Sequence, residues 1–236
     1  MLDINPDLKK LYDKHILKDT FTKDDMLAVL AKVRARKFKK GATLIAYDRM
    51  QKNYKYKLTE DTGKKFNKEF KPELTPLQML KMGVFEGKYC NDCILEYPKE
   101  WFIKRTKTAE ILDTLSPEGP NYKINYYKIK ARLSLGQWKR NKWIPCTYTR
   151  AGIAFCKERD IKPDSIYDPD IRGWFQWYCR YYLGRRLPVI DDIQIRRWRN
   201  FKRHVGQLQK NCKGNQSCRP RQHQAVLQWA YDATKL

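Results

Sequence analysis

Histidine is scarce in this sequence: its 236 residues include only three. This scarcity argues against histidine-based catalysis and against a histidine-rich metal site. The sequence also lacks the GxxxxGK[ST] phosphate loop, the GxGxxG dinucleotide fingerprint, the HExxH zinc motif and the GxSxG nucleophile elbow. The sequence therefore lacks the signature motifs of several large classes of nucleotide-dependent and hydrolytic enzymes.

Long apolar runs are absent as well, and the mean hydropathy is -0.80. We therefore expect no transmembrane helix and no membrane partner. The first ten residues carry no apolar core of a secretory signal. Cysteine is limited to seven residues at irregular spacing, and an odd number argues against a secreted disulfide framework. These absences together predict an intracellular protein.

The sequence has an excess of positive charge, with 50 Lys and Arg against 26 Asp and Glu and a net charge of +24. It is also 42% hydrophobic, so the chain can fold around a core and is unlike a disordered basic tail. A compact polycation repels itself, and a polyanionic partner is the simplest explanation. We expect a nucleic acid, DNA in preference to RNA, with the nucleus, a viral replication site or a virion as the location.

The pattern along the chain predicts a mainly α fold in two parts. Residues 1–72 are Lys-rich and predict a basic, partly irregular N-terminal extension or subdomain. Residues 73–236 predict a mainly helical core domain with basic C-terminal helices. Expected helix starts are marked by capping or proline signals at Thr22, Thr75-Pro76, Asp168, Pro188 and Pro220, and Gly184 marks a helix end.

The helix expected from Pro188 onward separates its faces. The apolar residues Trp198, Phe201, Val205 and Leu208 fall on one side at 100° per residue, and the basic residues Arg196, Arg199, Arg203 and Lys210 fall on the other. Repeated basic side chains on one helix face can each bind a phosphate. An ordinary solvated face is the alternative, but such faces usually mix charges, and this helix has no acid after Asp192.

More basic residues flank this stripe. Arg172 and Arg180 belong to the preceding helix, Arg185 and Arg186 to the turn between the helices, and Arg219 and Arg221 to the start of the last helix. We expect all six to extend a nucleic-acid surface, with an ion pair to Asp168 or Asp170 as the alternative for Arg172. Most rings of residues 174–182 are core by periodicity, and Trp177 is the candidate for base stacking.

Two cysteine pairs raise the question of a metal. Cys90 and Cys93 have the spacing of metal ligands, and Cys212 and Cys218 are separated by five residues. The four thiols together predict a structural zinc site, in which His204 or His223 can replace one cysteine. Buried free cysteines or a disulfide explain the same residues without a metal.

Residues 83–96 are the most enzyme-like segment. Two glycines bracket a turn, and Lys88, Tyr89 and Asp92 follow closely. An aspartate near a lysine or tyrosine can perform acid–base chemistry on a nucleobase or sugar. A base-modifying or base-excising enzyme is therefore the alternative function. A structural turn in which Asp92 caps a helix is the simpler interpretation.

Three strings carry a resemblance: GVFEGKYCNDC at 83–93, RGWFQWYCRYYLGRR at 172–186 and CRPRQHQAVLQWAYD at 218–232. With them, residues 74–236 resemble an uncharacterised family of hypothetical proteins from fungi and large DNA viruses. That family has no assigned activity, so the resemblance implies no site residue. It implies that residues 1–72 are an addition to a common domain. A further alternative function is a structural component of a virion or nucleoprotein assembly, with a protein partner.

Overall fold

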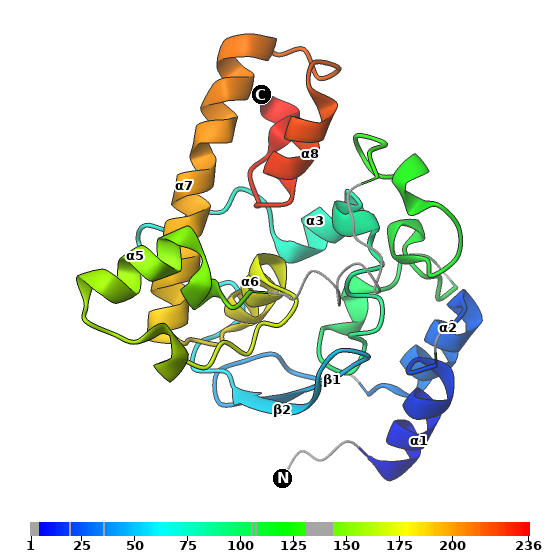
Figure 1. Ribbon diagram of the computed structural model, residues 1–236. Coiled ribbons are helices and arrows are strands. Elements are labelled where there is room, and N and C mark those ends of the chain that lie inside the picture. The colour runs from blue at the N-terminus through cyan, green and yellow to red at the C-terminus, as the bar shows by residue number, and fades with distance from the viewer. Residues whose placement is uncertain (1–4, 19, 35, 105, 107, 131–143) are drawn as a thin grey trace.

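A computed structural model describes residues 5–18, 20–34, 36–104, 106, 108–130 and 144–236, and over these ranges it is mainly α-helical. Its helices are α1 (Pro6–His15), α2 (Lys23–Lys32), α3 (Pro76–Lys81), α5 (Arg150–Glu158), α6 (Trp174–Leu183), α7 (Pro188–Cys212) and α8 (Pro220–Leu227) (Figure 1). The predicted mainly α class with a helical C-terminal part is confirmed. None of the helices in the described ranges combines the length and the apolar character needed to cross a membrane.

Side-chain caps fix the starts of α2 and α3. Thr22 accepts a hydrogen bond from the Asp25 backbone while Asp25 accepts one from the Thr22 backbone, and Thr75 and Gln78 form the same reciprocal pair. Proline in the first turn starts α7 and α8 as predicted. The start of α6 was predicted too early, because the chain from Asp168 remains irregular until Gly173, whose φ of +82° precedes the first helical turn.

The N-terminal residues are more regular than the sequence indicated. Besides α1 and α2 they form an antiparallel hairpin of β1 (Thr43–Tyr47) and β2 (Lys52–Lys57), with Thr43 opposite Lys57. Strand β1 is largely buried, whereas β2 keeps its lysines exposed and buries Tyr56. The hairpin thus covers the core with one strand and presents lysine to solvent on the other.

One core unites the residues on both sides of Pro72. Phe70 lies among rings from the C-terminal helices, with centroid distances of 5.3 Å to Trp177 and 5.0 Å to Trp198. Tyr12 of α1 and Leu44 of β1 belong to the same buried cluster. The expected boundary between an extension and a core domain therefore crosses a continuous hydrophobic core.

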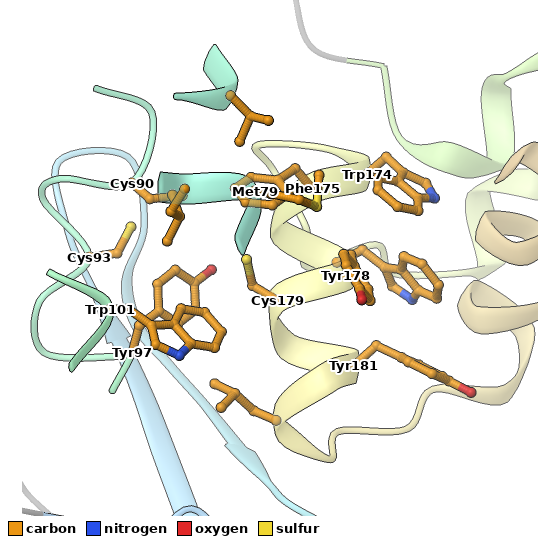
Figure 2. Close-up of a cluster of buried hydrophobic side chains, with 14 of the residues drawn as sticks. Met79, Cys90, Cys93, Tyr97, Trp101, Trp174, Phe175, Tyr178, Cys179 and Tyr181 are labelled. Atoms are coloured by element: carbon orange, nitrogen blue, oxygen red, sulfur yellow. The ribbon is translucent and has the colours of Figure 1, made fainter. Parts of the chain in front are cut away.

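Helix α6 lies at the centre of this core and is buried on more than one face. Figure 2 shows Trp174, Tyr178 and Tyr181 pointing to one side and Phe175 and Cys179 to the other. An all-round apolar helix is buried in this way. The expectation that Trp177 stacks on bases is wrong, because its side chain is fully buried and donates a hydrogen bond to Asp191 Oδ1 at 2.8 Å.

The stability of the fold should be sensitive to a single methyl group added at Gly87. Its φ is +63°, and a Cβ atom there would lie 1.7 Å from the carbonyl oxygen of Thr114. We expect Gly87→Ala to lower the free energy of unfolding by about 3 kcal/mol, measured by urea denaturation, because it adds a backbone collision to the left-handed strain. Gly119→Ala is the matched control: its φ of +69° is similar, but its Cβ would have no neighbour within 4 Å. Equal losses in the two variants would show that the collision does not matter.

Candidate nucleic-acid interface

Arg172 does not lie on the surface, contrary to the expectation that it contacts nucleic acid. It is 4% exposed, and its Nη2 atom lies 2.8 Å from both Asp48 Oδ1 and Asp92 Oδ2. Its Nη1 atom donates to the carbonyl of Tyr89. Burial raises the pKa of Asp48, but Arg172 and backbone donors outweigh burial and hold that pKa below its ordinary value. The side chain therefore neutralises two interior carboxylates.

Arg180 and Arg185 are interior residues as well, so their predicted phosphate contacts are also wrong. Arg180 Nε binds Glu96 Oε1 at 2.6 Å and its Nη1 binds Asp170 Oδ1 at 2.9 Å. Arg185 holds the same Asp170 through two hydrogen bonds of 2.9 and 2.6 Å. Burial works against the charge of Arg180, but Glu96 and Asp170 outweigh it and raise the arginine pKa well above its ordinary value. Both cations stay charged and paired inside the fold.

Burial is strongly uneven between the two signs of charge. Among the described residues eight acidic side chains are buried: Asp25, Asp48, Glu86, Asp92, Glu96, Asp170, Asp191 and Asp232. Only Arg172, Arg180 and Arg185 are buried among the basic ones. Because the chain has 26 acids and 50 bases, folding hides a much larger share of the negative charge. The surface is consequently more positive than the sequence charge alone indicates.

The basic face of α7, defined as Arg196, Arg199, Arg203 and Lys210, is half-buried at Arg196 and exposed at the other three residues. Arg203 and Lys210 are exposed, and no acid in the described part of the chain pairs with either. Arg196 contacts Glu158 of α5 at 2.6 Å, and Arg199 contacts Glu69 at 2.8 Å. As expected, α7 itself contributes no acid to this face after Asp192. Glu158 and Glu69, which pair with two of its arginines, belong to other segments of the chain.

Arg186 and the two arginines near α8 have different environments. Arg186 is half-buried, donates to the carbonyls of Tyr181 and Lys64, and lies 3.8 Å above the Tyr181 ring. The guanidinium group of Arg186 is therefore already engaged by backbone carbonyls and an aromatic ring. Arg219 and Arg221 are exposed, and Arg219 forms the N-cap of α8 with a φ of +49°. Arg219 and Arg221 are therefore exposed to solvent near the C-terminal end of α7.

The four-cysteine zinc site is not formed. Cys212 and Cys218 form a disulfide with each other, so they cannot join Cys90 and Cys93 as thiolate ligands. Within the described ranges no group of three or more His, Cys, Asp or Glu side chains is arranged to hold a metal ion. His223, the suggested substitute, is buried with Nδ1 3.2 Å from the carbonyl of Ala233.

Cys90 and Cys93 instead belong to the core, together with Cys179 of α6 (Figure 2). Burial and the Cys179 thiol raise the pKa of Cys90 well above its ordinary value, so the thiol stays protonated. A protonated, buried thiol is a packing group.

Lys88, Tyr89 and Asp92 do not converge on a common reaction centre. Lys88 Nζ donates to the carbonyl of Gly119 at 2.5 Å, whereas Asp92 binds Arg172 in the interior. Burial raises the pKa of Tyr89 well above its ordinary value and keeps its hydroxyl protonated. Asp92 does not cap a helix either, since the other donors to its carboxylate are the backbone N–H of Arg49 at 3.1 Å and the Cys93 thiol at 3.8 Å. Lys88 and Asp92 are thus engaged with different parts of the fold.

Sequence reasoning missed the acidic partners of the interior arginines, which are Asp48, Asp92, Glu96 and Asp170. The alternative that paired Arg172 with Asp168 or Asp170 was right about an ion pair but named other partners. A usable signal existed in Asp48, an acid that directly follows the apolar run 44–47 of a Lys-rich region.

No protein-family model, curated protein or solved structure matches the chain at a significant level. The resemblance to proteins of fungi and large DNA viruses therefore stays a prediction.

Proposed function

We propose that this protein binds nucleic acid, with DNA as the expected ligand, by contacting the phosphate backbone through the basic face of α7. The observation that supports it most is the uneven burial of charge: eight buried acids against three buried bases, counted over the described residues, leave a strongly cationic exterior. A surface of this kind concentrates polyanions and steers their association. Arg219 and Arg221 extend the contact beyond the C-terminal end of the helix.

The dimensions of the face suit a phosphate backbone. Arg196 and Lys210 are separated by about 21 Å along an α-helix, at 1.5 Å per residue. The same length of a DNA strand carries about six phosphates, at one per 3.4 Å of axis. Contacts to phosphates position a protein without reading its bases, so we propose binding with little sequence preference.

Glu158 and Glu69 occupy the positions on Arg196 and Arg199 where phosphates would bind. Both ion pairs are exposed, with the Glu158 side chain 51% and the Glu69 side chain 50% accessible. Exposed pairs of this kind contribute little stability, so a phosphate can replace the carboxylate. The two acids then act as competitors of the ligand and weaken its binding.

Removing the carboxylates of Glu69 and Glu158 should increase the affinity for nucleic acid. We expect Glu69→Gln with Glu158→Gln to tighten binding of a duplex about fivefold at low salt, measured by fluorescence anisotropy, with the gain fading as salt rises. Glu100→Gln removes an exposed acid outside these pairs and is the control. A gain from the control as large as that from either single variant would show that net charge alone matters.

The proposed function itself is tested by equilibrium binding of duplex DNA, single-stranded DNA and RNA across a salt series. A linear fall of log affinity with log salt supports phosphate neutralisation, and its slope gives the number of phosphates contacted. Weak binding of all three ligands at low salt would overturn the proposal and favour a protein assembly as the partner of the basic surface.

A further inference from the structure

A second row of cations lies beside α7. Residues 64–71 connect β2 to α3, and the trace passes behind α7 on its way (Figure 1). Arg186, just before α7, donates to the carbonyls of Lys64 and Lys65 at 2.9 and 3.3 Å. Further along, Arg199 binds Glu69 at 2.8 Å. These contacts place the segment alongside the first half of the helix, and the buried Phe70, whose ring lies 5.0 Å from that of Trp198 in α7, anchors it there.

The segment presents four exposed lysines next to those contacts: Lys64, Lys65, Lys68 and Lys71, here called the lysine row. Glu69 is engaged by Arg199, and Lys65 has an acid within reach, Glu60 at 3.3 Å. The row therefore retains most of its charge. It runs beside the basic face of α7, since Glu69 joins the two at Arg199.

The aromatic rings beside the lysine row are engaged by other side chains. Phe66 is half-buried and packs against Phe70 and Tyr181, with centroid distances of 5.8 and 5.4 Å. Arg186 lies over the Tyr181 ring at 3.8 Å. Proteins that hold single strands offer open rings on which unpaired bases stack. A surface of ammonium and guanidinium groups, with none of its nearby rings fully exposed, fits a ligand whose bases are stacked on each other.

We propose that the lysine row and the basic face of α7 together bind one double-stranded nucleic acid, each row contacting one of its two strands. The inference rests on the proposed function and adds the ligand class. Lysine ammonium groups act as mobile point charges, which suits a backbone contact without fixed register. A duplex has one phosphate backbone for each row, whereas a single strand has one in all, and we expect it to follow the basic face of α7, which spans about 21 Å along the helix.

The test compares two variants on two ligands. One carries Lys64→Gln, Lys65→Gln, Lys68→Gln and Lys71→Gln, and the other carries Arg203→Gln and Lys210→Gln. Each is titrated with a 20-base-pair duplex and with a 20-nucleotide single strand across a salt series. The lysine-row variant should lose about 100-fold in duplex affinity and about three units of salt slope, with less than a twofold change for the single strand. The α7 variant should weaken both.

A matched control removes four exposed cations at the α1–α2 end of the molecule, far from α7 in Figure 1: Lys10→Gln, Lys14→Gln, Lys32→Gln and Arg34→Gln. It should leave the duplex slope within one unit of the unmodified protein. Equal losses on duplex and single strand in the lysine-row variant, or no loss on either, would overturn the inference while the proposed function stands. Failure of the unmodified protein to bind any ligand would overturn the proposed function instead. Unchanged thermal unfolding confirms that the variants fold.

Discussion

Replacing Arg203 and Lys210 by glutamine is expected to weaken binding of duplex DNA about 30-fold at 0.15 M salt. The two side chains are exposed without acidic partners in the described part of the chain, so their full charge is available to phosphates. Each lost phosphate contact should reduce the slope of log affinity against log salt by about 0.9. The measurement is fluorescence anisotropy across a salt series, and we expect the slope to fall by about two units.

The same substitutions should leave the fold intact, because neither side chain contributes to the core. Control variants Lys14→Gln and Lys32→Gln remove two exposed cations from α1 and α2, at the other end of the molecule (Figure 1). If the control pair reduced the slope as much as the α7 pair, binding would depend on total charge, and a defined α7 interface would be rejected.

Replacing Arg180 by methionine should be the most destabilising single change in the interior. All three nitrogens of its guanidinium group are hydrogen-bonded: Nε to Glu96, Nη1 to Asp170 and the Pro169 carbonyl, and Nη2 to Gln51 and Glu96. Methionine fills similar space but leaves the buried Glu96 carboxylate without a cation. We expect the free energy of unfolding to fall by about 3–5 kcal/mol, measured by urea denaturation.

Two further variants separate the charge effect from loss of packing. Glu96→Gln in the Arg180→Met background removes the unpaired carboxylate and keeps an acceptor for the Tyr56 hydroxyl, which lies 2.8 Å from Glu96 Oε1. It should restore part of the lost stability. Arg196→Met, on an exposed pair, should cost less than about 1 kcal/mol. An Arg180→Met variant as stable as the unmodified protein would refute a structural role for this network.

The parts of the fold that depend on local signals were predictable from the sequence. Thr22 and Thr75 carry their capping partners three residues away, and Pro188 and Pro220 lie in first turns. The separation of faces on α7 followed from helical period alone. The exposed half of the candidate site was therefore found, including Arg203 and Lys210.

The interior half of the charge pattern was not predictable, because it depends on contacts between distant residues. Asp48 is 124 residues from Arg172, and Glu96 is 84 residues from Arg180. Helical periodicity assigned both arginines to the polar side of a helix expected from Asp168. Arg172 in fact precedes α6, and both side chains contact the hairpin and the 83–97 segment instead of water. The helical period of the sequence shows which residues share a face of a helix. Whether that face is buried or exposed depends on tertiary contacts.

The separation of the arginines into interior and exterior sets has an evolutionary consequence. On the exposed surface, where the proposed phosphate contacts lie, lysine and arginine both supply positive charge, so an exchange between them or a shift along α7 preserves the electrostatic attraction. Inside, the planar fork of Arg180 serves three side chains and a carbonyl at once, which an ammonium group cannot reproduce. Under the proposed function, binding and folding therefore depend on different arginines, and substitutions at the exposed positions can change the affinity in evolution without loss of the fold.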